Sequence, residues 1–448
     1  MKCPTVLLVG LLVTACHKDG GANKNSASTT LAAKKLDPLA LALTPHSGDT
    51  KADKEIVRWQ QQVRESRQPE IPLEALGWAY VAKARESFDP GFYKLAEQCA
   101  FALETRRPNS SEALLLRGHV LHNLHRFKEA EPLARDLVAR RGLAFDYGLL
   151  GDVLMEQGRL DDAVVAYQQM MDLRPDLQSY ARAAHIRWLK GDPSGATELM
   201  QMAVSAASPR DPESAAWVTT RLGLYLFQSG TKAEALQAAA LALEFQSDYP
   251  PALLLRGRIL LVQGKPADAI QSLKRAVERN PLPEYQWTLA EALRAAGRDE
   301  EAGAVELALR HHGATTDPRT YALYLATRGE DAELAARLSE KELDSRSDVF
   351  THDALAWSLA AAGRVEEART QMEQALAEGT QDARLFFHAA VISARCGRTL
   401  EAGAWLEKAA KASHMLLPSE QKQFQTVSAH LAKQTTAAAT EDFSTRGD

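Results

Sequence analysis

The stretch Ala144–Leu177, "AFDYGLLGDVLMEQGRLDDAVVAYQQMMDLRPDL", decides the fold. An apolar segment leads to Gly158, a short polar turn follows, and a second amphipathic segment runs on to Pro175. Apolar residues recur at helical spacing on both sides of the turn, which predicts two helices. A glycine after the first helix can adopt the left-handed conformation that ends it. The stretch therefore predicts a helical hairpin.

Related stretches recur along the chain. "EALLLRGHVL" at Glu112–Leu121 reappears as "PALLLRGRIL" at Pro251–Leu260, and ten copies of the hairpin can be aligned. Nine copies have a small residue at one shared position, where the remaining copy has Leu323. These small residues are Gly77, Gly118, Gly151, Ala184, Gly223, Gly257, Ala290, Ala356 and Ala390. A regular repeat of this length is typical of stacked hairpins, because one hairpin cannot bury its apolar face alone.

A second small residue follows the first by twelve positions. It is alanine in nine copies, and Ala96 fits the first copy if extra residues around "FDPGF" are allowed. These alanines are Ala130, Ala163, Ala196, Ala235, Ala269, Ala302, Ala335, Ala368 and Ala402. A turn glycine follows the first small residue by seven positions in most copies, at Gly158, Gly191, Gly230, Gly264, Gly297, Gly363 and Gly397. Two small residues per hairpin would let its helices approach closely.

This pattern resembles the tetratricopeptide repeat (TPR), with a period of about 34 residues, small residues at positions 8 and 20, an aromatic at 24 and proline at 32. Gly151, Ala163, Tyr167 and Pro175 match these marks. Most copies lack the proline, and the copy at Asp317–Leu343 is degenerate. The resemblance implies an all-α, right-handed solenoid of about ten helix-turn-helix repeats with a concave face.

The N-terminus indicates export. Lys2 precedes a short apolar run that is below the roughly 20 residues needed to span a bilayer. The run ends in Val13-Thr14-Ala15-Cys16, which resembles the bacterial lipobox. This resemblance implies secretion across the inner membrane, cleavage before Cys16 and lipidation of that cysteine. The alternative is an ordinary secretory signal with a chance cysteine.

The position after Cys16 holds His17. In Gram-negative lipoproteins an aspartate there favours retention at the inner membrane, so the resemblance implies an outer-membrane anchor facing the periplasm or the cell surface. The expected organisation is a signal peptide at 1–15, the lipidated cysteine and a flexible tether at 16–50, an initial helix at 51–69, the solenoid at 70–415, a capping helix at 416–434 and a disordered tail at 435–448.

Aromatic and histidine side chains recur at the positions that line the concave groove in the TPR family. They are Trp78, His119, His122, Phe145, His185, Trp188, Trp217, Phe227, Trp287, Tyr324, Phe350, Trp357 and Phe387. Large rings on an exposed face are typical of binding hot spots. The interpretation is a groove that binds a protein or peptide partner. The alternative is that the alignment is off by one residue in some copies and these rings belong to the core.

Two of these histidines raise the question of a metal. His119 and His122 share a helix face, and Asp152 or Glu156 of the next repeat would complete the three ligands of an open zinc site. Polar lining of the groove is the favoured interpretation, with no metal and no cofactor. The alternative function is a cell-wall glycan-binding or metal-dependent protein that stacks sugars on Trp188 and Trp217.

Other function classes find no support in the sequence. The 448 residues carry a net charge of −5 without a basic block, which predicts no nucleic-acid partner. No His-Glu-x-x-His helix, Gly-x-Ser-x-Gly elbow or dinucleotide-binding glycine pattern is present. Cys99 and Cys396 lie within helical patterns and are interpreted as core residues. The sequence therefore predicts a binding protein and not an enzyme.

Overall fold

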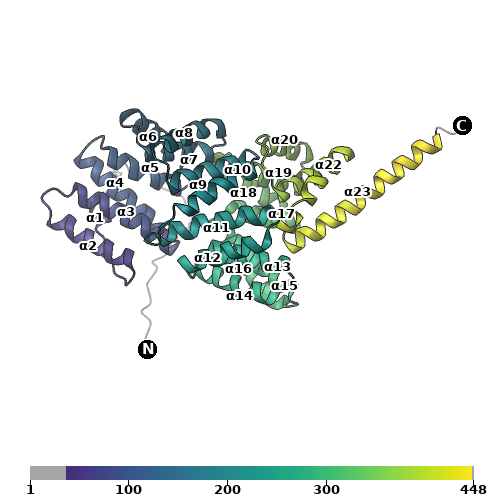
Figure 1. Cartoon of the computed structure of the whole chain (residues 1–448), viewed down its shortest axis with the longest axis horizontal. Coiled ribbons are helices and arrows are strands. Elements are labelled where there is room, and N and C mark those ends of the chain that lie inside the picture. Colours follow the sequence, from purple (N-terminus) through teal and green to yellow (C-terminus); the bar gives the residue numbers. More distant parts are fainter. Residues whose placement is uncertain (1–36, 446–448) are drawn as a thin grey trace, which may run out of the picture. The chain divides into compact units, whose positions relative to one another are not determined.

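The computed structural model describes residues 37–445, with side-chain environments through Lys433, and every regular element in that range is a helix (Figure 1). The helices are α1 (Pro38–Ala42), α2 (Lys51–Glu65), α3 (Glu70–Ser87), α4 (Gly91–Arg106), α5 (Ser111–Asn123), α6 (Phe127–Arg140), α7 (Ala144–Glu156), α8 (Leu160–Leu173), α9 (Leu177–Leu189), α10 (Pro193–Ser205), α11 (Pro212–Gln228), α12 (Lys232–Phe245), α13 (Pro250–Val262), α14 (Pro266–Arg279), α15 (Pro283–Ala295), α16 (Asp299–Thr316), α17 (Pro318–Arg328), α18 (Ala332–Ser345), α19 (Val349–Ala361), α20 (Val365–Leu376), α21 (Ala383–Arg395), α22 (Thr399–Ala410), the 3-10 helix η1 (Ser413–Met415) and α23 (Pro418–Thr445).

Ten consecutive hairpins run from α3 to α22, so the predicted all-α TPR solenoid is confirmed. Each odd-numbered helix packs against its even-numbered successor, and odd-numbered helices also contact one another along the array, as in the pairs α5–α7 and α13–α15. Within the described residues, no helix is long and apolar enough to cross a membrane.

The small residues of the repeat stand where helices approach most closely. A Cβ atom placed on Gly151 would lie 2.3 Å from the Tyr167 ring, and one on Gly257 would lie 2.6 Å from the Leu273 side chain. All ten alanines at the second small position are fully buried. Larger side chains at either position would push the helices apart, so these residues set the packing of each hairpin.

The turn glycines take positive φ values, as the sequence predicts. At Gly158, for example, φ is +73°, and this conformation ends the first helix of the hairpin. The second repeat has His125 in the place of that glycine, and His125 takes the same left-handed conformation with φ of +57°. A Cβ atom there costs roughly 1 kcal/mol, and the first repeat bears the same cost at Phe88, which ends α3 with φ of +59°.

The ends of the solenoid differ from the expected boundaries. The predicted tether reaches residue 50, but α1 packs on the first repeat, and the Tyr80 hydroxyl donates a 2.8 Å hydrogen bond to the Ala42 carbonyl. At the other end, the cap was expected to stop at 434, whereas α23 continues to Thr445 through most of the predicted disordered tail. The signal peptide at 1–15, Cys16, the tether up to residue 36 and residues 446–448 lie outside the described residues.

The later repeats pack on the earlier ones. The Ser347 backbone N–H donates to the Glu156 carbonyl at 3.1 Å, and the Arg346 guanidinium lies 2.7 Å from the Glu156 carboxylate. Further along, the buried Thr380 hydroxyl donates to the Leu189 carbonyl. These contacts join residues up to 191 positions apart in the sequence. A repeat pattern describes only neighbours, so it does not predict them.

Candidate functional site

The odd-numbered helices from α3 to α21 form one face, called here the inner face. Its first part holds a cavity of about 430 Å³, called here the N-terminal cavity, lined almost wholly by α3, α5, α7, α9 and α11. Five predicted groove or metal residues meet there from three different helices. They are His119, His122, Asp152, Glu156 and His185. Trp217, also predicted, stands at its border.

Ion pairs fix the polar floor of the N-terminal cavity. The Arg182 guanidinium donates two hydrogen bonds, of 2.8 and 2.7 Å, to the Asp152 carboxylate, and the Tyr167 hydroxyl adds a third of 2.9 Å. Burial opposes ionisation of Asp152, but the Arg182 charge holds its pKa below the usual range. Arg85 pairs with Glu213 at 2.8 Å across the rim. The floor is therefore built before any partner arrives.

The histidines of this cavity are neutral. Burial lowers the pKa of His119 to about 3, and burial together with the nearby Arg221 lowers that of His185 to about 3. The His122 pKa is lowered for the same main reason, and its Nε2 has no hydrogen-bond partner. Neutral imidazoles can donate and accept hydrogen bonds, but they supply no charge.

The inner face continues into a second cavity of about 340 Å³, called here the central cavity, between α11, α13 and α15. Trp217 and Arg221 line both cavities, so the two are continuous. The floor of the central cavity is apolar, with Leu224 and Leu254 among its residues. Trp217 is 39% exposed, and its ring stands between the two cavities. An apolar floor with one exposed indole is suited to a partner's side chains.

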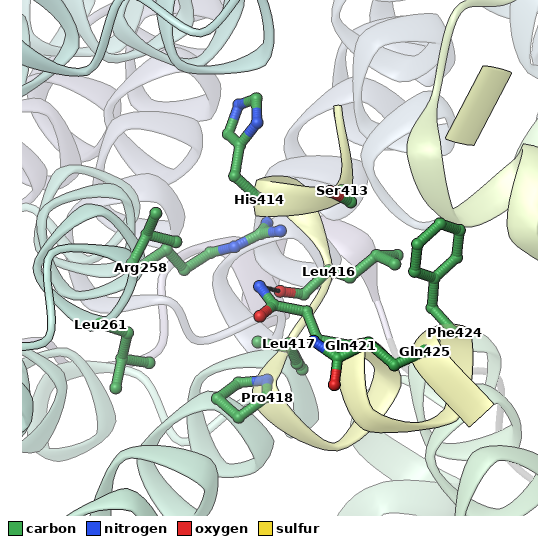
Figure 2. A pocket seen from close by; sticks show the side chains of 11 residues that line it. Arg258, Leu261, Ser413, His414, Leu416, Leu417, Pro418, Gln421, Phe424 and Gln425 are labelled. Atoms are coloured by element: carbon green, nitrogen blue, oxygen red, sulfur yellow. Dashed lines mark hydrogen bonds between the residues drawn. The ribbon is translucent and has the colours of Figure 1, made fainter. Parts of the chain in front are cut away.

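Beyond the central cavity, the chain's own C-terminal segment occupies the inner face. Figure 2 shows Arg258 of α13 together with residues 413–425 around a cavity of about 320 Å³. The Arg258 guanidinium donates to the Met415 carbonyl at 2.5 Å, and His414 lies 2.6 Å from the Phe227 carbonyl. The Leu416 side chain is buried at this contact. The groove here already holds a short peptide segment.

The structure divides the thirteen predicted groove residues into three groups. Two are exposed, Trp217 at 39% and Phe145 at 47%. Five are half-buried: Trp78, His119, His122, His185 and Phe350. Six are buried: Trp188, Phe227, Trp287, Tyr324, Trp357 and Phe387. The expectation of an open aromatic groove is therefore corrected for the last six, whose rings are part of the core.

The buried rings are covered by chain that returns from later repeats. Trp188 stacks between Tyr225 at 6.0 Å and Phe350 at 5.7 Å, measured between ring centroids. Phe227 is covered by the His414 ring at 5.2 Å. The pair Trp188 and Trp217, considered as a platform for sugars, is accordingly not exposed together, because only Trp217 reaches the surface.

The four candidate metal ligands share a cavity but do not form a metal site. Asp152 is already satisfied by Arg182 and Tyr167. The Glu156 carboxylate forms an ion pair with Arg346, and burial raises the pKa of Glu156 despite this ion pair. Among the described residues, no group of three or more histidine, cysteine, aspartate or glutamate side chains is placed to hold a metal ion.

Sequence reasoning missed the arginines of the inner face. Arg182, Arg221 and Arg258 all line its cavities, and each lies at or near a groove position of its repeat. The available signal was their helical register, the same signal that singled out the rings. Arginine is also enriched in binding hot spots, so it merited the same attention.

Comparison with known proteins agrees with the architecture. Family models described as tetratricopeptide repeat match residues 147–177, 254–318 and 354–414. The protein is an all-α solenoid built of TPR hairpins, a class whose groove geometry serves protein interaction. No curated protein matches the sequence.

Several solved structures are similar in fold. The chain is similar to MamA (20% identity, 35% of this chain and 90% of that chain, TM-score 0.30). It is also similar to yeast Tom70 (15% identity, 86% and 97%, TM-score 0.37). A third is YrrB, described as a TPR protein with an unusual peptide-binding site (14% identity, 44% and 97%, TM-score 0.31). At these identities the likenesses concern the fold alone.

Proposed function

We propose that this protein is a scaffold that binds an extended segment of a partner protein along the N-terminal and central cavities. The observation that carries the proposal is the continuity of these cavities at Trp217 and Arg221, over a floor whose ion pairs are already formed. Binding then costs little reorganisation, because the floor is preorganised. The role is binding without chemistry.

The neighbouring part of the inner face supports an extended ligand. There the chain's own residues 413–417 lie against the groove, with a carbonyl held by Arg258 and apolar side chains buried. Leu416 has an extended backbone, with φ of −73° and ψ of 145°. The same inner face thus holds a 3-10 turn followed by the extended Leu416 in one part and leaves open cavities in the other.

The test is a crosslinked pulldown from envelope extract with the full chain in detergent as bait. The matched baits are Trp217→Ala in the groove and Leu307→Ala, which removes another exposed apolar side chain far from the cavities on α16. We expect a partner that the wild type and the Leu307 variant capture and the Trp217 variant loses. Equal capture by all three folded baits would place the binding surface elsewhere.

We further propose that the scaffold works in the cell envelope, anchored through a lipid on Cys16, in the outer membrane. The support is the lipobox-like sequence before Cys16 and the histidine that follows it. Multiple acyl chains hold a protein stably at a membrane, whereas one chain binds weakly. Cys16→Ala should abolish labelling by a palmitate analogue and release the protein from the membrane fraction. Membrane retention of the unlabelled variant would contradict the anchor.

A further inference from the structure

The charges of the inner face indicate the chemistry of the partner, given the proposed function. Four arginines line the N-terminal and central cavities: Arg85, Arg182, Arg221 and Arg258. Three have a carboxylate within 4.0 Å: Arg85 pairs with Glu213, Arg182 with Asp152, and Arg258 with Glu284. Among the described residues, Arg221 has none.

The contacts of Arg221 leave its charge uncompensated. Its Nη2 donates to His185 Nδ1 at 2.8 Å, and the guanidinium lies over the Tyr225 ring at 5.6 Å from the centroid. Its Nε is buried without a hydrogen-bond partner. Because the His185 imidazole is neutral, neither neighbour balances the charge. A half-buried cation with an unused donor favours an anionic group from outside.

The surroundings of Arg221 specify more than an anion. Trp217 precedes it by one helical turn on α11 and lines the same two cavities. On the other side lie the apolar side chains of Leu224, Leu254 and Pro251 in the central cavity. A free anion would leave this apolar floor uncovered, whereas a peptide can cover it with a side chain. The combination fits a carboxylate beside a large apolar residue.

We propose that the partner is an acidic peptide segment in which an aspartate or glutamate pairs with Arg221 and a large apolar side chain about three residues away fills the central cavity. The spacing follows from helix axes about 8–10 Å apart and about 3.3 Å per extended residue. The acidic residue lies over α11 and the apolar residue over α13.

The test selects peptides from a phage-displayed random dodecapeptide library on the full chain in detergent. Parallel selections use Arg221→Gln and a matched control, Arg256→Gln, which changes an arginine of the neighbouring helix α13 that lines neither cavity. Wild-type and control selections should enrich an acidic residue about three positions from Leu, Phe or Trp. The Arg221 variant should keep the apolar residue and lose the acidic one.

Affinities of synthesised winners then quantify the effect. Replacing the acidic residue by its amide should weaken binding to the wild type at least about tenfold and leave binding to Arg221→Gln unchanged. Peptides that depend on Trp217 but show no acidic preference would overturn this inference and leave the proposed function standing. A library without any binder that depends on Trp217 would overturn the proposed function, and the inference with it.

Discussion

The inner face has two halves built on the same repeat, and the exposure of their aromatic side chains differs. In the half formed by α3–α11, the N-terminal cavity is open and Trp217 stays exposed, although Trp188 and Phe227 are buried there. In the half formed by α13–α21, Trp287, Trp357 and Phe387 lie at other groove positions of the repeat, and all three are buried. The repeat fixes where a side chain points, whereas the chain that returns over it decides whether a partner can reach it. One register therefore yields exposed surface at some ring positions and core at others.

The largest expected effect tests this contrast directly. Trp287→Ala should lower the free energy of unfolding by about 3–5 kcal/mol, because it empties a packed site beside the Tyr324 ring. Trp217→Ala should cost less than about 1 kcal/mol, because its ring already meets solvent. Urea denaturation of both variants measures the difference. Equal costs would mean that the two halves of the inner face do not differ as described.

The second prediction concerns two turn glycines, at which the contrast is reversed, because the turn in the half with the N-terminal cavity is the one that later chain covers. Gly158 and Gly264 share a positive φ, yet a Cβ on Gly158 would lie 2.2 Å from the Ser347 carbonyl oxygen and one on Gly264 would meet nothing within 4 Å. Gly264→Ala should cost about 1 kcal/mol, from backbone strain alone. Gly158→Ala should cost about 2–3 kcal/mol, since it must also displace the loop that contacts Glu156.

Thermal unfolding of the Gly158 and Gly264 variants provides the measurement. A variant that combines Gly158→Ala with Ser347→Gly serves as a control. The alanine Cβ clashes with the backbone carbonyl of residue 347, which the second substitution does not remove, so the cost should persist. Equal costs at Gly158 and Gly264 would show that the later repeats do not press on the turn at Gly158.

The third prediction uses the neutral histidines of the open half. His119 and His185 have pKa values of about 3 in the folded protein, compared with about 6.5 when unfolded. Below pH 6.5 the unfolded state therefore binds protons that the folded state does not, and stability falls as the pH falls toward 3. At pH 5 each histidine should cost about 1–2 kcal/mol relative to pH 7.

The pH effect is measured as the free energy of unfolding between pH 7 and pH 5. The double variant His119→Gln, His185→Gln should lose less stability over this range than the wild type. The exposed His311→Gln variant, on the outer helix α16, should behave like the wild type. An unchanged pH dependence in the double variant would contradict the assignment of neutral, buried imidazoles.

The sequence predicts the fold more completely than the site, for a physical reason visible in particular residues. Gly151 and Ala163 serve contacts within one hairpin, and such local contacts repeat with the period of the sequence. The stack of Phe350 on Trp188 joins residues 162 positions apart, a separation that is no part of the repeat period. Nothing in the spacing of residues encodes that contact. The repeat register places His119 and Asp152 on neighbouring helices, where both line the N-terminal cavity, but it does not reveal which rings the later chain covers.

The smallest expected effects distinguish the contacts that join the two halves. Lys190 and Glu378 form an exposed ion pair of 2.8 Å, and Glu378→Gln should change the free energy of unfolding by no more than about 0.5 kcal/mol. Thr380, two residues later, is fully buried and donates to the Leu189 carbonyl. Thr380→Val should cost about 1–2 kcal/mol, because it leaves that carbonyl without its donor while keeping the side-chain volume. Urea denaturation should therefore rank Thr380→Val above Glu378→Gln. The reverse ranking would mean that surface charge, and not buried hydrogen bonding, holds the later repeats against the earlier ones.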